Sequence, residues 1–261
     1  MTIDLLTKER LQAINRATLK YSGAEAEKDY FLAVVSKVIN ESELKNKIVF
    51  KGGTAIHHCY LPQMRFSEDL DFTAVDQSIT VDEVKAALEA QDFLSVKKEY
   101  VSKATIKLER VQYAGPYGQP NSLKVEIDFV QNVVLPAQTL PYKNVWGVDT
   151  TVQVMDIREI CAEKIRAMND RVRFRDFFDF YLITERLKLD MSEVLELVRK
   201  KEVRTVIVPE NILEHWNLAK TERQKEASIV FYDMTVADSD IEAALQKLEF
   251  EPVPVNSVFQ K

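Results

Sequence analysis

Two kinds of hydrophobic periodicity divide the chain. Between Ala24 and about Asn40, apolar residues recur at helical spacing, which predicts a helix with one buried face. From Ile48 onward, short runs of β-forming residues are separated by turn residues, which predicts strands. The expected strands are residues 48–50, 69–72, 93–101, 104–113, 123–130 and 152–155. Residues 131–150 contain two prolines and a glycine, so we expect them to be irregular.

Helical patterning returns after residue 155. Asp156 is the expected N-cap of a helix whose apolar residues fall on one face. Thr80 and Glu83 have the spacing of a capping box, which predicts a helix start inside the strand-rich region. Other helices are expected at residues 1–21, 191–200, 210–220 and 241–250. We therefore predict an α+β fold in which residues 1–155 form N-terminal helices and an α/β core and residues 156–261 form a helical domain.

One stretch, residues 48–72, combines a strand, a glycine turn and a second strand with two carboxylates. Gly52 and Gly53 allow a tight turn and close approach of a ligand to the backbone. Thr54 is the expected N-cap of a helix to about Leu61, and the first N–H groups of that helix could bind a phosphate.

Asp69 and Asp71 are two residues apart on an extended segment, so both carboxylates face the same side. Carboxylate oxygens are ligands that Mg²⁺ prefers, and beside a phosphate-sized turn they predict a site for magnesium and a nucleoside triphosphate. Ser67, two residues before Asp69, could donate to the γ-phosphate, be modified as a means of control, or simply cap the loop.

The motifs Lys-Gly-Gly-Thr-Ala, at residues 51–55, and Arg-Phe-Ser-x-Asp-Leu-Asp-Phe, at residues 65–72, resemble those of the AbiEii/AbiGii family. That family is a branch of the DNA polymerase β-like nucleotidyltransferases and includes the MenT toxins. The resemblance spans about residues 45–185. It implies a mixed-sheet nucleotidyltransferase core with Asp69 and Asp71 as metal ligands and catalytic residues.

A third carboxylate is expected on the strand at residues 123–130, where Lys124, Glu126 and Asp128 share one face. Two-metal nucleotidyl transfer uses such a group close to the paired aspartates. The resemblance places Glu126 in this position, with Asp128 as the alternative. A third possibility is that both residues only line a solvated face.

A second motif covers Glu159–Ala167 and Arg171–Tyr181 and is similar to the family's second signature, a lysine-bearing helix followed by Arg-Asp-aromatic-x-Asp. The resemblance implies that Lys164 contacts the triphosphate and that Asp176 is a further active-site residue. Alternatively, Asp176 orients Lys164 or an arginine, and the cations belong to a solvated helix. Asp179 is expected to cap a helix or form a salt bridge. The full set of predicted phosphate-binding residues is Lys51, Gly52, Gly53, Thr54, Ser67, Lys164, Arg171, Arg173 and Arg175.

Composition narrows the class of protein. The formal net charge of −6 argues against a protein that coats nucleic acid over its whole surface, although a local basic groove is compatible with it. Cys59 and Cys161 lie among apolar residues, which favours buried free thiols and a reducing cytoplasm. His57 and His58 lack partners at the spacing of a zinc site and are interpreted as structural. No signal peptide and no membrane-spanning segment are expected.

The predicted function is a nucleotidyltransferase that uses Mg²⁺ or Mn²⁺ and transfers a nucleoside monophosphate from an NTP, with the helical domain completing the active-site cleft. The resemblance implies the 3′ end of tRNA as acceptor, a toxin of a toxin–antitoxin or abortive-infection system, and a cognate antitoxin. Residues 158–204 would then supply the basic groove. The alternatives are a protein or small-molecule acceptor, or a catalytically silent nucleotide-binding module.

Overall fold

The computed structural model describes residues 3–227 and 236–256 of the chain. The fold consists of two compact units, an α/β unit and a helical unit, and each is built from more than one stretch of sequence. The α/β unit comprises Met1–Cys59, Phe66–Val130 and Ala137–Val154, and the helical unit comprises Tyr60–Arg65, Gln131–Pro136 and Met155–Lys261. Two short segments that precede residue 155 therefore belong to the helical unit.

The described strands of the α/β unit form one mixed sheet in the order β3-β4-β5-β2-β1-β7-β6. They are β1 (Ile48–Lys51), β2 (Asp69–Ala74), β3 (Leu94–Val101), β4 (Thr105–Tyr113), β5 (Asn121–Asp128), β6 (Gln138–Pro141) and β7 (Thr151–Val154). Strand β2 is antiparallel to β1 and parallel to β5, so it lies at the centre of the sheet. The register places Asp71 of β2 beside Lys51 of β1 and Glu126 of β5.

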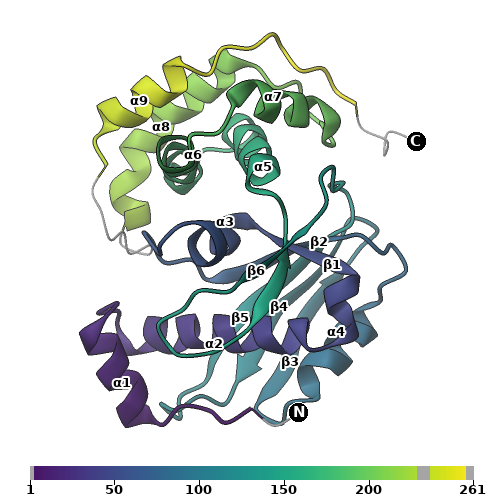
Figure 1. The fold of residues 1–261 in the computed structure, drawn as a ribbon, viewed down its shortest axis with the longest axis vertical. Coiled ribbons are helices and arrows are strands. Elements are labelled where there is room, and N and C mark those ends of the chain that lie inside the picture. The colour runs from purple at the N-terminus through teal and green to yellow at the C-terminus, as the bar shows by residue number, and fades with distance from the viewer. Residues whose placement is uncertain (1–2, 228–235, 257–261) are drawn as a thin grey trace. The chain divides into compact units, whose positions relative to one another are not determined.

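Helices pack on one face of this sheet, where the apolar residues of β4 and β5 are buried. The long helix α2 (Gly23–Asn40) runs across the sheet in Figure 1, and Phe31 of α2 stacks on Tyr113 of β4 with ring centroids 3.9 Å apart. Helix α1 (Lys8–Ala17) packs on α2, and α4 (Val81–Glu89) packs on α2 and β3. The predicted capping box of Thr80 and Glu83 opens α4.

A compact helical connection joins β1 to the loop before β2. It begins with α3 (Gly52–Ala55) directly after β1 and continues as the π-helical turn η2 (Ile56–Tyr60). Single π-helical turns are rare and often lie at functional sites. The short 3-10 turn η1 (Glu43–Asn46) leads from α2 into β1.

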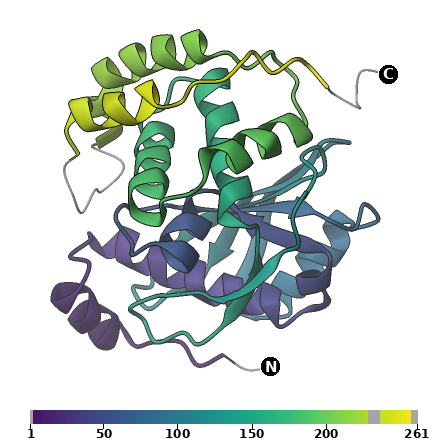
Figure 2. The same ribbon diagram turned by 45° about the horizontal axis from the view of Figure 1, so that its top comes forward.

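The helical unit is organised around α5, which packs against α6, α7 and α8. Its helices are α5 (Ile157–Asp170), α6 (Phe174–Leu187), α7 (Met191–Lys200), α8 (Pro209–Ala227) and α9 (Asp238–Gln246). Phe174 and Phe177 of α6 pack on Trp216 of α8 in an aromatic core, with ring centroids 5.9 Å and 5.3 Å from it. Helices α8 and α9 lie side by side, as Figure 2 shows, and Lys220 and Glu242 form an ion pair of 2.7 Å between them.

The mixed sheet and its helices confirm the predicted α+β fold, but three local expectations are wrong. The first helix covers only Lys8–Ala17 instead of residues 1–21. Thr54 lies inside α3, which begins at Gly52, and its side chain does not cap a helix. Strand β6 lies in the region expected to be irregular, and Pro141, which lacks an N–H donor, is tolerated at the end of this edge strand. None of the helices in the described part of the chain has the length and apolar character that crossing a membrane requires.

Candidate active site

The central feature of the α/β unit is the pair of aspartates at the start of β2. Leu70 and Phe72 point into the core, and the alternation of the strand places Asp69 and Asp71 together on the opposite face. The predicted juxtaposition of the two carboxylates is therefore present. We define this face of the sheet, opposite α2 and α4, as the open face.

Gly52 is shaped to fit the carboxylate of Asp71. Its φ of +79° lies in the left-handed region, which glycine adopts without strain. A Cβ at this position would lie 2.7 Å from Asp71 Oδ2, so a side chain here would force the Asp71 carboxylate to move. The glycine turn that the sequence analysis interpreted as a phosphate cradle thus also makes room for the second aspartate.

Crowding of negative charge shows in the titration of Asp71. The pKa of this carboxyl is raised to about 6, first by burial and then by the neighbouring Asp69 and Glu126 carboxylates, against the opposing charges of Lys124 and Lys51. The protein therefore holds two like charges together at a position where a cation would relieve their repulsion.

Glu126 and Asp128, the two candidates for the third carboxylate, have different surroundings. Glu126 lies beside Asp71 in the register of β2 and β5, and its carboxylate forms ion pairs with Lys107 at 3.0 Å and Lys124 at 2.6 Å. Asp128 lies beside Thr73 instead. Its carboxylate pairs with Lys51 at 3.1 Å and accepts a hydrogen bond from the Val130 N–H group.

Thr54 and Ser67 form a small hydroxyl network behind the aspartates. Thr54 is buried, and its Oγ1 lies 2.5 Å from the backbone oxygen of Asp69 and 2.8 Å from Ser67 Oγ. Gly53 precedes Thr54 in α3. These contacts tie α3 to the first residue of β2, so the hydroxyl of Thr54 helps to hold the backbone from which Asp69 projects.

The residues of the open face have the chemistry that suits a divalent cation, since Asp69 and Asp71 supply hard oxygen donors and burial and the neighbouring carboxylates raise the pKa of Asp71. The fit is incomplete. Among the described residues, no three His, Cys, Asp or Glu side chains are grouped as a metal site. The Glu126 carboxylate faces two lysines, so it would have to turn to become a ligand.

The helical unit contains a second cluster, a chain of alternating charges centred on Lys164. Lys164 Nζ of α5 lies 2.8 Å from Asp176 and 2.7 Å from Asp179, and both aspartates belong to α6. Residues three apart lie on the same side of a helix, which explains how both aspartates reach one ammonium group. At one end of the chain Asp176 binds Arg171, and at the other Asp179 binds Arg65.

The centre of this cluster is buried. Lys164 is 8% exposed, and Asp176 and Asp179 are fully buried. Burial alone would raise the pKa of Asp176, but the charges of Lys164 and Arg171 hold that pKa well below its usual range. Asp176 is therefore ionised at neutral pH, and the cations Lys164 and Arg171 beside it suit an anionic ligand such as a phosphate group.

Arg65 and Asp179 form a contact that the sequence analysis missed in part. Arg65 Nε and Nη2 donate to the two oxygens of Asp179, both at 2.7 Å, in a buried bidentate pair. Asp179 was expected to cap a helix or form a salt bridge, and the salt bridge is present. Arg65 lies inside the first motif without an assigned role. Its position next to Phe66, an apolar residue that is buried, indicates that Arg65 could be buried too. This signal is weak, because it does not indicate which residue pairs with Arg65.

Of the predicted arginines, Arg171 belongs to this cluster, and Arg173 and Arg175 lie near it in sequence. Arg171 follows α5 and has a half-exposed side chain, Arg173 is exposed just before α6, and Arg175 lies in the first turn of α6.

His57 and His58 are both buried, and burial lowers the pKa of His58, whose Nδ1 lies 2.8 Å from the backbone oxygen of Lys143. The two cysteines are free and buried, as expected.

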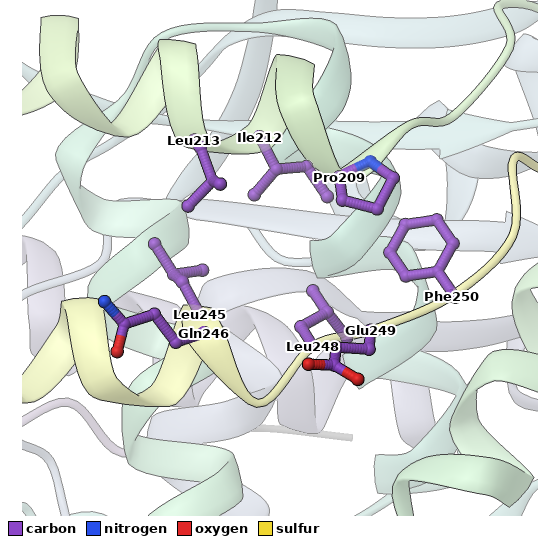
Figure 3. Close-up of a pocket in the computed structure, with 8 residues that line it drawn as sticks. All are labelled: Pro209, Ile212, Leu213, Leu245, Gln246, Leu248, Glu249 and Phe250. Carbon is purple, nitrogen blue, oxygen red and sulfur yellow. The ribbon is translucent and has the colours of Figure 1, made fainter.

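A separate apolar pocket of about 350 Å³ lies in the helical unit between the start of α8 and the end of α9 (Figure 3). Ile212 and Leu213 face Leu245 and Leu248 across it, and Phe250 lies at one end. None of the predicted phosphate-binding residues lines this pocket. An apolar lining does not suit a triphosphate, so the pocket is not the nucleotide site.

Two comparisons with known proteins found matches, one to a family model and one to a solved structure. A family model described as the nucleotidyl transferase AbiEii toxin of a type IV toxin–antitoxin system matches residues 34–254. Among solved structures, a match is the nucleotidyltransferase toxin MenT4 from Mycobacterium tuberculosis H37Rv, with a TM-score of 0.67. It is 20% identical in sequence, and the match covers 91% of this chain and 87% of that chain, so it supports the fold alone. The search of curated proteins found no match.

Proposed function

The chain belongs to the AbiEii family of nucleotidyl transferase toxins, and we propose that it transfers a nucleoside monophosphate from an NTP to the 3′ end of an RNA, with tRNA as the acceptor. The observation that carries this proposal is the crowded aspartate pair of β2, with Gly52 leaving room for Asp71. A pair of this kind suits a divalent cation that binds triphosphate oxygens.

The residues of the open face have separate roles in this proposal. Asp69 and Asp71 would hold Mg²⁺, or Mn²⁺ in its place, and Glu126 would be the third ligand if its carboxylate turned away from Lys107 and Lys124. The metal supplies charge neutralisation at the reacting phosphate. Gly52, Gly53 and Thr54 shape the turn next to the phosphates, and Ser67 and Lys51 contribute a hydroxyl and a cation at its edges.

The Lys164 cluster supplies positive charge for the triphosphate. Its aspartates occupy two directions around the ammonium group, and this fixes Lys164 in one orientation. A lysine held in this way does not have to be ordered when the phosphate binds, so its charge acts from a prepared position. Arg171, Arg173 and Arg175 are the nearby cations that we propose to contact the same anion.

The proposed reaction forms a bond between the acceptor hydroxyl oxygen and the α-phosphorus. The bond from that phosphorus to its bridging oxygen breaks, pyrophosphate leaves, and the hydroxyl proton passes to solvent. Catalysis consists mainly of positioning and of neutralising the charge that develops on the phosphates.

Family membership also supports the biological setting that we propose. As a toxin, the protein would act in the cytoplasm and be held in check by a cognate antitoxin. Adding a nucleotide to the 3′ end of tRNA would block translation. The reduced state of the two buried cysteines is consistent with this location.

The proposal is tested by transfer from each of the four α-labelled NTPs, with Mg²⁺, into total RNA and total protein. We expect label in tRNA-sized RNA with the wild-type protein and none with Asp69→Ala or after removal of the metal by chelation. Label in protein would assign a different acceptor. Tight NTP binding without any transfer would contradict the enzymatic function.

Replacing Gly52 by alanine is expected to lower transfer about a hundredfold, because the new Cβ would displace the Asp71 carboxylate. The positive φ adds about 1 kcal/mol of backbone strain to this steric effect. Gly118→Ala is the matched control, since it has a φ of +67° and no atom within 4 Å of the added Cβ. The prediction fails if the two variants lose activity equally, as measured by initial rates of NMP transfer.

A further inference from the structure

A single row of side chains crosses the open face from the edge of the sheet to the aspartates. Tyr100 of β3 pairs with Lys107 of β4, Lys107 pairs with Glu126 of β5, and Glu126 pairs with Asp71 of β2. Side chains of directly paired residues project from the same face of a sheet. Three strand spacings of about 4.8 Å separate Tyr100 from Asp71, or about 14 Å in all.

Tyr100 is unusual because it places a large aromatic ring in solvent on an edge strand. Its side chain is 53% exposed, whereas the aromatic residues of the unit's core are buried. The next residue, Val101, is 51% exposed but pairs with the buried Ile106, so it projects from the helix-covered face. Glu99 projects from that face too, since it forms an ion pair with Lys85 of α4. Tyr100 is thus the aromatic residue of β3 on the open face.

Lysines surround the path from Tyr100 to the aspartates. Lys107 and Lys124 flank Glu126, and Lys98 pairs with Glu109 on β4. The hydrogen bond from Lys98, aided by the charges of Lys107 and Lys124, holds the pKa of Glu109 below its ordinary value. Each of the three lysines is thus ion-paired with a glutamate, Lys98 with Glu109 and both Lys107 and Lys124 with Glu126.

An exposed aromatic ring with lysines close by is a usual combination for binding a single-stranded nucleic acid, in which bases stack on rings while phosphates contact lysines. A protein partner is less well matched, since this row lacks the apolar side chains that form the core of a protein interface. The row ends at the residues where the acceptor hydroxyl would have to react.

We propose that the open face of β3, β4 and β5 binds the 3′-terminal nucleotides of the acceptor RNA, with a base stacked on Tyr100 and phosphates on Lys98, Lys107 and Lys124. This inference rests on the proposed function and adds the path of the acceptor to it. The acceptor strand enters over the edge strand β3 and runs across the sheet towards Asp69 and Asp71.

The experiment measures the binding of a short fluorescent single-stranded RNA with a free 3′-hydroxyl by anisotropy. Tyr100→Ala is expected to weaken binding about tenfold, and Tyr100→Phe, which keeps the ring, is expected to bind like the wild type. Val101→Ala is the matched control, because it removes an equally exposed side chain from the opposite face. Wild-type affinity in Tyr100→Ala, or an equal loss in Val101→Ala, would overturn the proposal.

A second variant, Lys98→Ala, tests the contact between lysine and phosphate through the salt dependence of RNA binding. Lys98 is the most exposed of the three lysines and lies outside the proposed catalytic groups. Removing one phosphate contact lowers the slope of log Kd against log salt by about 0.7 for a single strand. We expect this change in Lys98→Ala, and an unchanged slope would contradict the assignment of Lys98 to a phosphate.

Kinetics separate this inference from the proposed function. In Tyr100→Ala, the KM for RNA should rise about tenfold while the KM for the NTP stays unchanged. Transfer by the wild type together with an unchanged KM for RNA in Tyr100→Ala would reject the RNA path and leave the function intact. RNA binding that depends on Tyr100 without any transfer by the wild type would reject the function and keep the binding face.

Discussion

Asp71→Asn is expected to lower NMP transfer about a thousandfold and, in the absence of divalent metal, to raise the stability of the protein near pH 7. The loss of transfer follows from removing one of the two charges that would bind the cation. The gain in stability follows from removing one of two crowded like charges. Opposite changes in activity and stability are what distinguish a functional carboxylate from a structural one.

The sign of the stability change follows from the direction of the pKa shift. The ordinary pKa of Asp71 is 3.8 and its folded-state pKa is about 6, so the folded protein binds the proton more tightly than the unfolded chain. Proton binding by Asp71 therefore adds to the free energy of unfolding. This contribution is fully present below about pH 4 and is lost as the pH rises through about 6. Near neutral pH the asparagine variant should therefore be more stable by about 1–3 kcal/mol.

Thermal unfolding in a chelating buffer, followed from about pH 4 to pH 8, measures this difference. The stability gained by Asp71→Asn should grow over this range, and added Mg²⁺ should reduce it by stabilising only the wild type. Asp92→Asn, at an exposed aspartate of the same unit, is the control and should change stability little. A destabilised Asp71→Asn protein would refute the like-charge interpretation.

Asp179→Ala is expected to destabilise the protein by about 3–5 kcal/mol, the usual effect of breaking a buried ion pair. The change removes both oxygens that bind the buried Arg65 and one of the two carboxylates that hold Lys164. Transfer activity should also fall, because Lys164 loses the contact that fixes one side of its ammonium group. Urea unfolding and initial rates measure the two effects.

Glu196→Ala provides the matched control for Asp179→Ala. Glu196 also pairs with an arginine, Arg199, at 2.8 Å, but both side chains are exposed, so its removal should change stability by less than about 1 kcal/mol. In a double-mutant cycle, Arg65→Met should have a much smaller effect in the Asp179→Ala background than in the wild type. Independent, additive effects of the two changes would show that the pair is not the source of the stability.

Much of the sheet was predictable because its strands carry local signals. Alternation in β4 and β5 located both strands, and the two-residue period placed Asp69 with Asp71 and Glu126 with Lys124 on one face. Strand β6 was not predicted, since it contains a proline and lies in a turn-rich segment, and its pairing with β7 is a tertiary effect.

The candidate site was less predictable where it depends on partners far apart in the sequence. Lys164 and Asp176 lie in one motif, and their contact follows from neighbouring helices. The pairing of Arg65 with Asp179 joins residues that the chain separates widely, and no local pattern indicates it. The choice of Lys107 as a partner for Glu126 likewise depends on strand register, which the sequence leaves open.

The segments 60–65 and 131–136, which belong to the helical unit although they precede residue 155, restrict how such a gene can evolve. Arg65 in the first segment completes the pair with Asp179, and the N–H groups of Val134 and Leu135 in the second donate to Glu159 at 2.8 Å and 3.0 Å. A recombination event at residue 155 would therefore combine the helices of one parent with these contacts from another. Hybrids of two parent genes should be functional when segments 60–65 and 131–136 come from the same parent as the helices. We therefore expect the two units to be inherited together.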